Sequence, residues 1–152
     1  MTADHEAHPA HLLLHADWSR LVKHWATTAG LPVHDEDTHV SLDVTRRQAA
    51  ADDLHVHLTT SSRFLVAFIT NGRTLGPGEL ARAAAAANAW NIEQLMPTLS
   101  VWNVRGRQPH LAGVCTLPLL CRMSQHDFDA TASGWIDQAT TMFARCREVF
   151  RL

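Results

Sequence analysis

The chain has 152 residues, of which 46% are hydrophobic and 18% are charged, and its formal net charge is −2 with histidine neutral. These values are typical of one globular domain that buries its own core, and they exclude an intrinsically disordered chain. The near-neutral charge gives no electrostatic reason to expect nucleic acid or an anionic membrane as the main ligand.

The first residues predict a disordered tail, over 1–11, ahead of a single domain over 12–152, because the tail carries histidine and acidic residues with little apolar content. The tail lacks the basic start and long apolar run of a signal peptide. The apolar stretches elsewhere fall well short of the ~20 residues that a membrane helix needs, so no membrane insertion is expected.

Three cysteines, Cys115, Cys121 and Cys146, indicate the redox compartment. Their odd number argues against a complete set of disulfides, and the absence of a CxxC pair argues against a thiolate zinc site. Reduced, buried thiols are therefore expected, and these fit a cytoplasmic protein.

The first half of the chain predicts one helix and three strands. Apolar residues recur at helical spacing over 14–29, and a glycine and a proline follow as stop signals. Apolar and polar residues alternate over 40–44 and 54–58, which predicts two strands with one apolar face each. The third strand, over 63–70, is apolar on both faces, so both of its faces should be covered.

The second half predicts a helix, two strands and a final helix. Pro77 begins a helix that contains an alanine block and runs to about Leu95. Strands follow over 99–104 and 111–117, and Ser124 with an aspartate three residues later caps a last helix. The order is therefore α-β-β-β-α-β-β-α. Short connections favour antiparallel pairs, so we predict an α+β fold with a five-stranded antiparallel sheet and three helices packed against it.

Late in the second predicted helix, Asn88, Trp90 and Asn91 form an Asn-x-Trp-Asn segment. This segment, followed by two strands and a long helix, resembles the YbjN-domain family, and the likeness in residues is clearest over 80–150. The family contains bacterial proteins assigned as candidate sensory transduction regulators, and its fold is similar to that of type III secretion chaperones. The resemblance implies a chaperone-like or regulatory protein without catalytic residues or a cofactor.

Two interpretations fit the asparagines. Asn88 and Asn91 share one ridge of the helix, and asparagine has a low helix propensity, so the presence of both residues in one turn calls for an explanation. In the structural interpretation, which we favour, they satisfy backbone groups near Pro97 while Trp90 anchors the core. In the functional interpretation they hydrogen-bond a bound chain. The predicted protein-binding residues are then Asn88, Trp90, Asn91 and Trp102.

The apolar surface of the predicted sheet suggests a partner. Five strands make a sheet about 24 Å wide, and three helices of about 10 Å diameter cover one face of it. The strands over 63–70, 99–104 and 111–117 are apolar on both faces, so part of the second face should be apolar and uncovered. Such patches mark interaction sites. We therefore predict a non-enzymatic, chaperone-like or adaptor module that binds a protein partner and forms a homodimer.

The 11 histidines lead to an alternative. If the first two strands form a hairpin, Asp43 lies near His55 and Ser41 near His57, with His39 on the same face. Such a cluster is the kind of site that holds a metal or senses a change around pH ~6.5. The alternative function is a metal- or pH-responsive sensor, but polar residues on a solvated face are ordinary, so no residue is assigned as a metal ligand.

Overall fold

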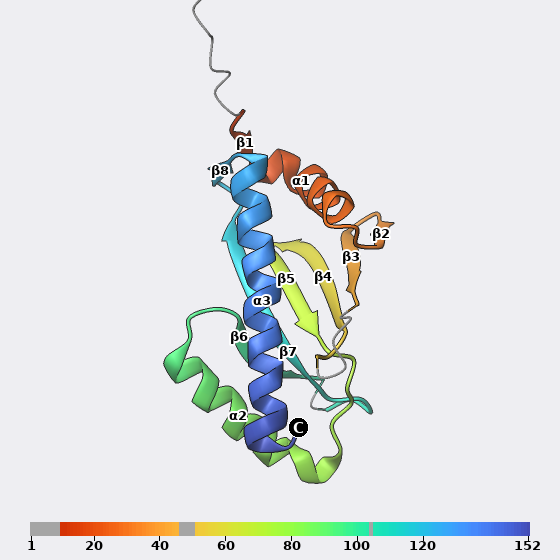
Figure 1. Ribbon diagram of the computed structural model, residues 1–152, viewed down its shortest axis with the longest axis vertical. Coiled ribbons are helices and arrows are strands. Elements are labelled where there is room, and N and C mark those ends of the chain that lie inside the picture. Colours follow the sequence, from red (N-terminus) through yellow and green to blue (C-terminus); the bar gives the residue numbers. More distant parts are fainter. Residues whose placement is uncertain (1–9, 46–50, 104) are drawn as a thin grey trace, which may run out of the picture.

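The computed structural model describes residues 10–45, 51–103 and 105–152 (Figure 1). Its elements, in chain order, are β1 (Leu12–Leu13), α1 (Leu14–Thr28), β2 (Val33–Glu36), β3 (His39–Val44), β4 (Leu54–Ser61), β5 (Phe64–Thr70), the 3₁₀ turn η1 (Pro77–Glu79), α2 (Leu80–Glu93), β6 (Thr98–Trp102), β7 (His110–Pro118), β8 (Arg122–Met123) and α3 (Gln125–Phe150). The main sheet is antiparallel throughout, in the order β2-β3-β4-β5-β7-β6. β1 and β8 form a separate two-stranded ribbon.

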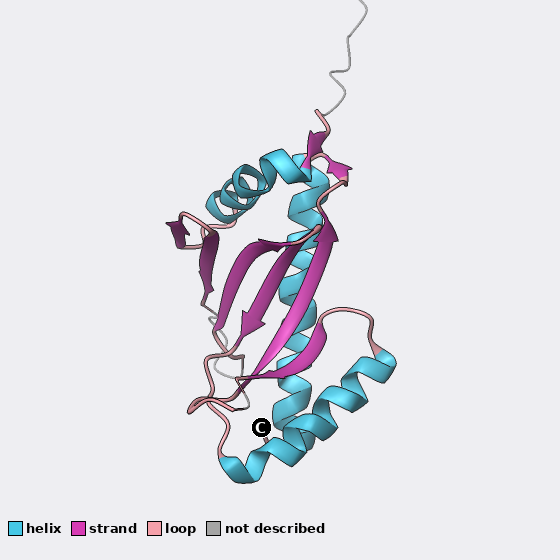
Figure 2. Cartoon of the chain, turned by 180° about the vertical axis from the view of Figure 1, so that it is seen from behind, coloured by secondary structure: helices cyan, strands magenta, loops and turns pink. Residues whose placement is uncertain are grey.

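The helices lie on one side of the main sheet. α3 runs along the sheet for most of its length, α1 lies near one end of the molecule and α2 near the other (Figure 1). Seen from the opposite side, the strands are in front and no helix of the described chain covers them (Figure 2). None of the described helices combines the length and the apolar character that crossing a bilayer requires.

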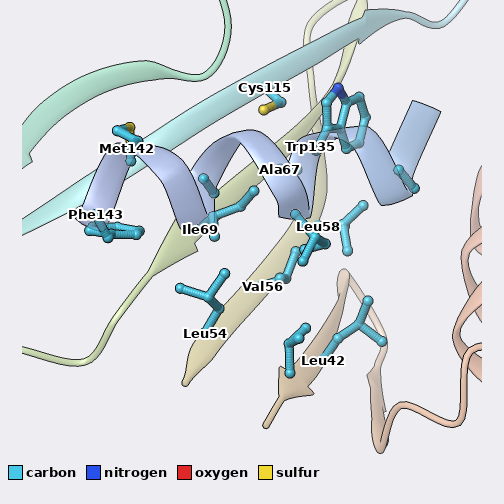
Figure 3. Packing of buried hydrophobic residues seen from close by; sticks show 14 of the residues in the cluster. Leu42, Leu54, Val56, Leu58, Ala67, Ile69, Cys115, Trp135, Met142 and Phe143 are labelled. Atoms are coloured by element: carbon cyan, nitrogen blue, oxygen red, sulfur yellow. The ribbon is translucent and has the colours of Figure 1, made fainter. Parts of the chain in front are cut away.

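Alternation along the strands decides which face of the sheet the helices cover. The register places Leu42 opposite Val56, and Val56 opposite Ile69, so one face is continuously apolar. Figure 3 shows side chains of α3, among them Phe143 and Met142, packed against this face. All three helices and the sheet contribute to one cluster of buried apolar residues. The helices are therefore held by the face that the strand pattern makes apolar.

Helix ends follow the signals that the sequence carries. Gly30 adopts a φ of 68° just after α1, a left-handed conformation that glycine takes without steric cost. At the start of α3, the Ser124 hydroxyl accepts a hydrogen bond from the Asp127 backbone N–H at 3.1 Å and donates one to the Asp127 carboxylate at 2.8 Å. The predicted cap of the last helix is thereby confirmed.

The predicted α+β class and element order are confirmed, but the main sheet has six strands instead of five. The added strand is β2, which pairs with β3 at the sheet edge. Its residues His34, Asp35 and Glu36 have low strand propensity, so the sequence predicted no strand there, and pairing with the β3 backbone determines its conformation. Residues 1–9 of the predicted tail, and position 104 of the predicted fourth strand, lie outside the described residues.

All three cysteines are free thiols, and two of them should be unreactive in the folded protein. Burial raises the pKa of Cys115 to about 12 and that of Cys146 to about 11, and the thiolate is the reactive form. We expect a water-soluble thiol reagent at neutral pH to modify only Cys121, which is half-buried between β7 and β8. Mass spectrometry should find a single adduct on the native chain and adducts on all three cysteines in denaturant. Fast modification of either buried thiol in the native chain would disprove this expectation.

Candidate functional site: the open face of the sheet

We call the face of the main sheet that the helices leave uncovered the open face. The register assigns to it alternate residues of each strand, with a polar half over β2, β3 and β4 and an apolar half over β5, β7 and β6. Its residues are His34, Glu36, His39, Ser41, Asp43, His55, His57, Thr59 and Ser61 in the polar half, and Phe64, Val66, Phe68, Thr70, Thr98, Ser100, Trp102, His110, Ala112, Val114, Thr116 and Pro118 in the half that carries the apolar side chains. This face is toward the viewer in Figure 2.

Two aromatic side chains dominate the apolar half. The rings of Phe68 and Trp102 meet edge to face, with centroids 4.6 Å apart and an interplanar angle of 86°. They come from β5 and β6, so the pair bridges β7 between them, where Ala112 is only 1% exposed. Trp102 itself remains 40% exposed. The prediction of an apolar surface on the second face, uncovered by the chain's own helices, is confirmed.

Hydrogen bonds organise the polar half. The Asp43 carboxylate lies 2.7 Å from Nδ1 of His55 and 3.3 Å from Nε2 of His34, and Ser41 Oγ lies 3.2 Å from Nδ1 of His57. Asp43 pairs with His55 and Ser41 with His57 across β3 and β4, which confirms the register predicted from sequence. Each of these side chains is therefore held by a partner on the neighbouring strand.

Two groups of the polar half have displaced pKa values. The hydrogen bond from His55 lowers the pKa of the Asp43 carboxyl, partial burial opposes this, and His34 adds to the lowering. Burial lowers the pKa of His57, and repulsion from His39, whose ring centroid lies 4.1 Å away, lowers it further. At neutral pH, Asp43 therefore carries its charge and His57 is neutral.

The lowered pKa of His57 predicts a pH-dependent loss of stability. The unfolded chain, with a histidine pKa of about 6.5, takes up a proton there before the folded chain does, so the free energy of unfolding falls as the pH drops below about 6.5. His57→Asn retains a polar group near Ser41 and should make this fall shallower. Urea unfolding at several pH values measures it, with His24→Asn, at an exposed position of α1, as the control. Identical pH profiles for wild type and His57→Asn would refute the assignment.

A hollow of about 390 Å³ opens in the middle of the open face. Its volume is at the lower end of the range for ligand sites. Polar and apolar groups line opposite sides of it, namely Asp43, His55 and His57 on one side and Phe68, Ala112 and Trp102 on the other. The hollow thus joins the two halves of the open face.

The hollow offers a ligand hydrogen bonds, charge and apolar contact. The described part of the chain contains no group of three His, Cys, Asp or Glu side chains placed to share a metal ion. Ser41 bonds to His57, whereas Asp43 bonds to His55 and His34, so among these described residues no imidazole joins the hydroxyl to the carboxylate as a nucleophile relay requires.

Two of the predicted protein-binding residues serve the fold instead of the open face. Trp90 is 3% exposed, and its Nε1–H donates to the Pro97 carbonyl at 2.7 Å. The Asn91 amide donates to the Leu99 carbonyl and accepts from the Leu99 N–H, both at 2.9 Å. These contacts agree with the structural interpretation for Trp90 and Asn91, but Asn88, which that interpretation also placed against backbone groups near Pro97, is exposed on α2 instead. Of the four predicted binding residues, Trp102 is the one that the structure places on the open face.

Asn91 occupies backbone groups on the outer edge of β6, as a neighbouring strand would. Its replacement by alanine should lower the free energy of unfolding by about 1–2 kcal/mol, because two backbone groups lose their partner. The side chain of Asn88, one turn earlier in α2, is exposed and makes no hydrogen bond to a described residue. Asn88→Ala is therefore the matched control, with an expected change within about 0.5 kcal/mol in urea unfolding. Equal losses for the two variants would show that the amide contacts do not matter.

Sequence reasoning missed two features of the open face. His34 was not placed beside Asp43, because β2 was not predicted. The contact between Phe68 and Trp102 depends on β7 lying between β5 and β6, and the strand order was not predicted. The signal that pointed toward it was the alternation of Phe64, Val66 and Phe68 along a strand whose other face is also apolar.

The fold and the open face together define a class of α+β protein with a six-stranded antiparallel sheet and one layer of helices. The solved structure of YbjN from E. coli, a candidate transcription regulator, has this architecture: the TM-score is 0.66 at 12% sequence identity, over 85% of this chain and 90% of that chain. No protein-family model matches the sequence, and no curated protein matches it. The chain has a YbjN-like fold, as the resemblance at Asn88, Trp90 and Asn91 implied.

Proposed function

We propose that this chain is a non-enzymatic regulatory or adaptor protein, chaperone-like in action, that works in the cytoplasm as a homodimer and binds a protein partner on its open face. The observation that carries the proposal is the sheet face that no described helix covers, where Trp102 is 40% exposed beside Phe68. Exposed aromatic side chains on a rigid support are the usual anchors of protein interfaces. The likeness in fold to YbjN, itself a candidate transcription regulator, supports a regulatory role.

The shape of the site favours a polypeptide over a small metabolite. The hollow crosses several strands, from Asp43 on β3 to Trp102 on β6, with four interstrand spacings of about 4.8 Å between them. A site that extends over five strands and is open to solvent fits a chain segment or a second protein surface.

The proposal is tested by placing a charge on the open face. Val114 is half-buried there on β7, and Val114→Arg should disrupt apolar contact with either occupant of the open face, the second copy of this chain or the partner that displaces it. Val149→Arg, at a 63% exposed position of α3, is the matched control. Light scattering at micromolar concentration should give about twice the 16.9 kDa chain mass for wild type and control, and the single-chain mass for Val114→Arg.

Partners cross-linked in cells and recovered with the wild type and the Val149→Arg control should be lost from Val114→Arg. A wild-type mass of one chain would overturn the dimer. Recovery of the same partners with all three proteins would overturn the assignment of the open face.

A second candidate function is a pH-responsive sensor, and the packing of His39 against His57, beside the pair of His55 and Asp43, favours it. In this function, protonation of the cluster alters the open face and its occupancy. The double variant His55→Ala, His57→Ala should then show a mass by light scattering that no longer changes with pH. If the double variant and the wild type respond alike to pH, the sensor is dismissed. A melting temperature that saturating zinc leaves unchanged would dismiss a metal-responsive sensor.

A further inference from the structure

The open face carries no permanent positive charge on its described strands. None of the strand residues that the register places there is a lysine or arginine, although the chain has 13 of them. The carboxylates on this face are Glu36 and Asp43. Of these two described residues, Asp43 lines the hollow and Glu36 does not. Histidine is mostly neutral above about pH 7. At neutral pH the hollow is therefore negative at one end.

The negative end retains room for a ligand. The Asp43 side chain is 43% exposed, and the histidine nitrogens of His34 and His55 contact one oxygen each. A carboxylate has about four lone-pair sites, so acceptor capacity remains on the solvent side. The His55 contact also fixes the carboxylate in position. A cationic donor that approaches from the hollow would meet a preorganised anion.

The other end of the hollow is aromatic. Phe68 lies on β5, two interstrand spacings across the sheet and two residues along the strand from Asp43 on β3, which corresponds to about 12 Å. Trp102 leans toward Phe68 from the far side and leaves 40% of its surface exposed. An apolar side chain placed here would lie against both rings.

We infer that the hollow takes an extended segment of the partner protein in which an arginine lies four residues from an apolar side chain. The arginine meets Asp43, and the apolar side chain meets Phe68 and Trp102. An extended chain advances about 3.3 Å per residue, so four residues span about 13 Å, and this even spacing turns both side chains toward the sheet. Arginine suits the site because its planar fork donates to a carboxylate with fixed geometry. This inference rests on the proposed function and specifies the chemistry of the partner.

The same arrangement makes recognition of the arginine pH-dependent. The titratable groups that surround Asp43 and the hollow are His34 and Glu36 on β2, His39 on β3, His55 and His57 on β4, and His110 on β7. Five histidines face two carboxylates, so protonation turns the local charge from negative to positive. Binding of a cation opposes this protonation, and its affinity should therefore fall as the pH drops below about 6.5.

Two matched peptides test the inference. One is a capped heptapeptide with arginine at its second position, leucine at its sixth and threonine elsewhere, and its twin carries citrulline, which is neutral, in place of the arginine. Titrations followed by NMR should give about three- to fivefold tighter binding of the arginine peptide at about pH 7.5. The ratio should fall to about one in Asp43→Asn, and also in wild type at about pH 5.5. Glu36→Gln, which removes the other carboxylate of the face, should preserve it.

The outcomes separate the inference from the function on which it rests. If both peptides bind equally well to wild type and neither binds to Val114→Arg, the arginine preference is overturned while the open face remains a protein-binding site. An arginine preference that survives in Asp43→Asn also overturns the inference. If neither peptide binds wild type, the inference is overturned, and the mass and cross-linking of Val114→Arg decide the function independently.

Discussion

Replacement of Trp90 by alanine is expected to lower the free energy of unfolding by about 3–5 kcal/mol, the largest loss that we predict for a single substitution. Trp90 is 3% exposed and lies where α2 packs on β6. Truncation removes the indole from this contact and leaves a cavity between the helix and the edge strand. It also removes the donor to the Pro97 carbonyl, which is part of a buried residue.

Trp90→Phe separates the two contributions. Phenylalanine restores most of the apolar contact and lacks the N–H, so its loss should be about 1–2 kcal/mol. Urea unfolding of the wild type and both variants, followed by circular dichroism, gives the three free energies. If Trp90→Ala costs less than about 1 kcal/mol, Trp90 is not the anchor that its contacts indicate.

The face on which each strand residue lies could be predicted because side chains alternate between the two faces of a strand, so that one buried residue fixes the sides of its neighbours. Leu42 and Val56 had to lie on the same side of the sheet as the helices, which placed Asp43 and His55 on the other side. The cross-strand pairs of the polar half followed from this and from one assumed hairpin. The class of the fold followed in the same way, from the order of helical and strand periodicity.

The features that the sequence did not predict depend on contacts between distant segments of the chain. β6 follows β5 and α2 in the chain but joins the sheet beyond β7, and no local pattern encodes that choice. Without the strand order, Phe68 and Trp102 could not be brought together, and the hollow between Trp102 and Asp43 could not be foreseen. Similarly, β2 forms because β3 offers an edge, although its own sequence favours a loop.

Asn91 shows why the sequence left two interpretations open. An amide on a helix ridge presents the same pattern whether it bonds the backbone of its own chain or that of a bound one. The structure pairs it with both backbone groups of Leu99. The amide thus makes the two backbone hydrogen bonds that a bound chain would make with an edge strand. It occupies one position at which another strand could pair with β6.

Trp102→Ala is expected to have the opposite signature to Trp90→Ala: a small change in stability and a large loss of binding. The indole of Trp102 is 40% exposed, and its described ring contact is the edge-to-face pair with Phe68, so the free energy of unfolding should fall by only about 1 kcal/mol. An exposed aromatic anchor at the centre of an interface is worth about 2 kcal/mol or more, which is a loss of at least about thirtyfold in affinity.

The dimer dissociation constant, from light scattering on dilution, measures the effect of Trp102→Ala, and the recovery of cross-linked partners provides a second reading. Ile92→Ala is the matched control, since Ile92 is 77% exposed on α2 and does not belong to the open face. Unchanged self-association and partner recovery in Trp102→Ala would remove the open face as the binding surface. Loss in Trp102→Ala alone, at nearly wild-type stability, would separate the residue that binds a partner from Trp90, which the same chain uses to fold.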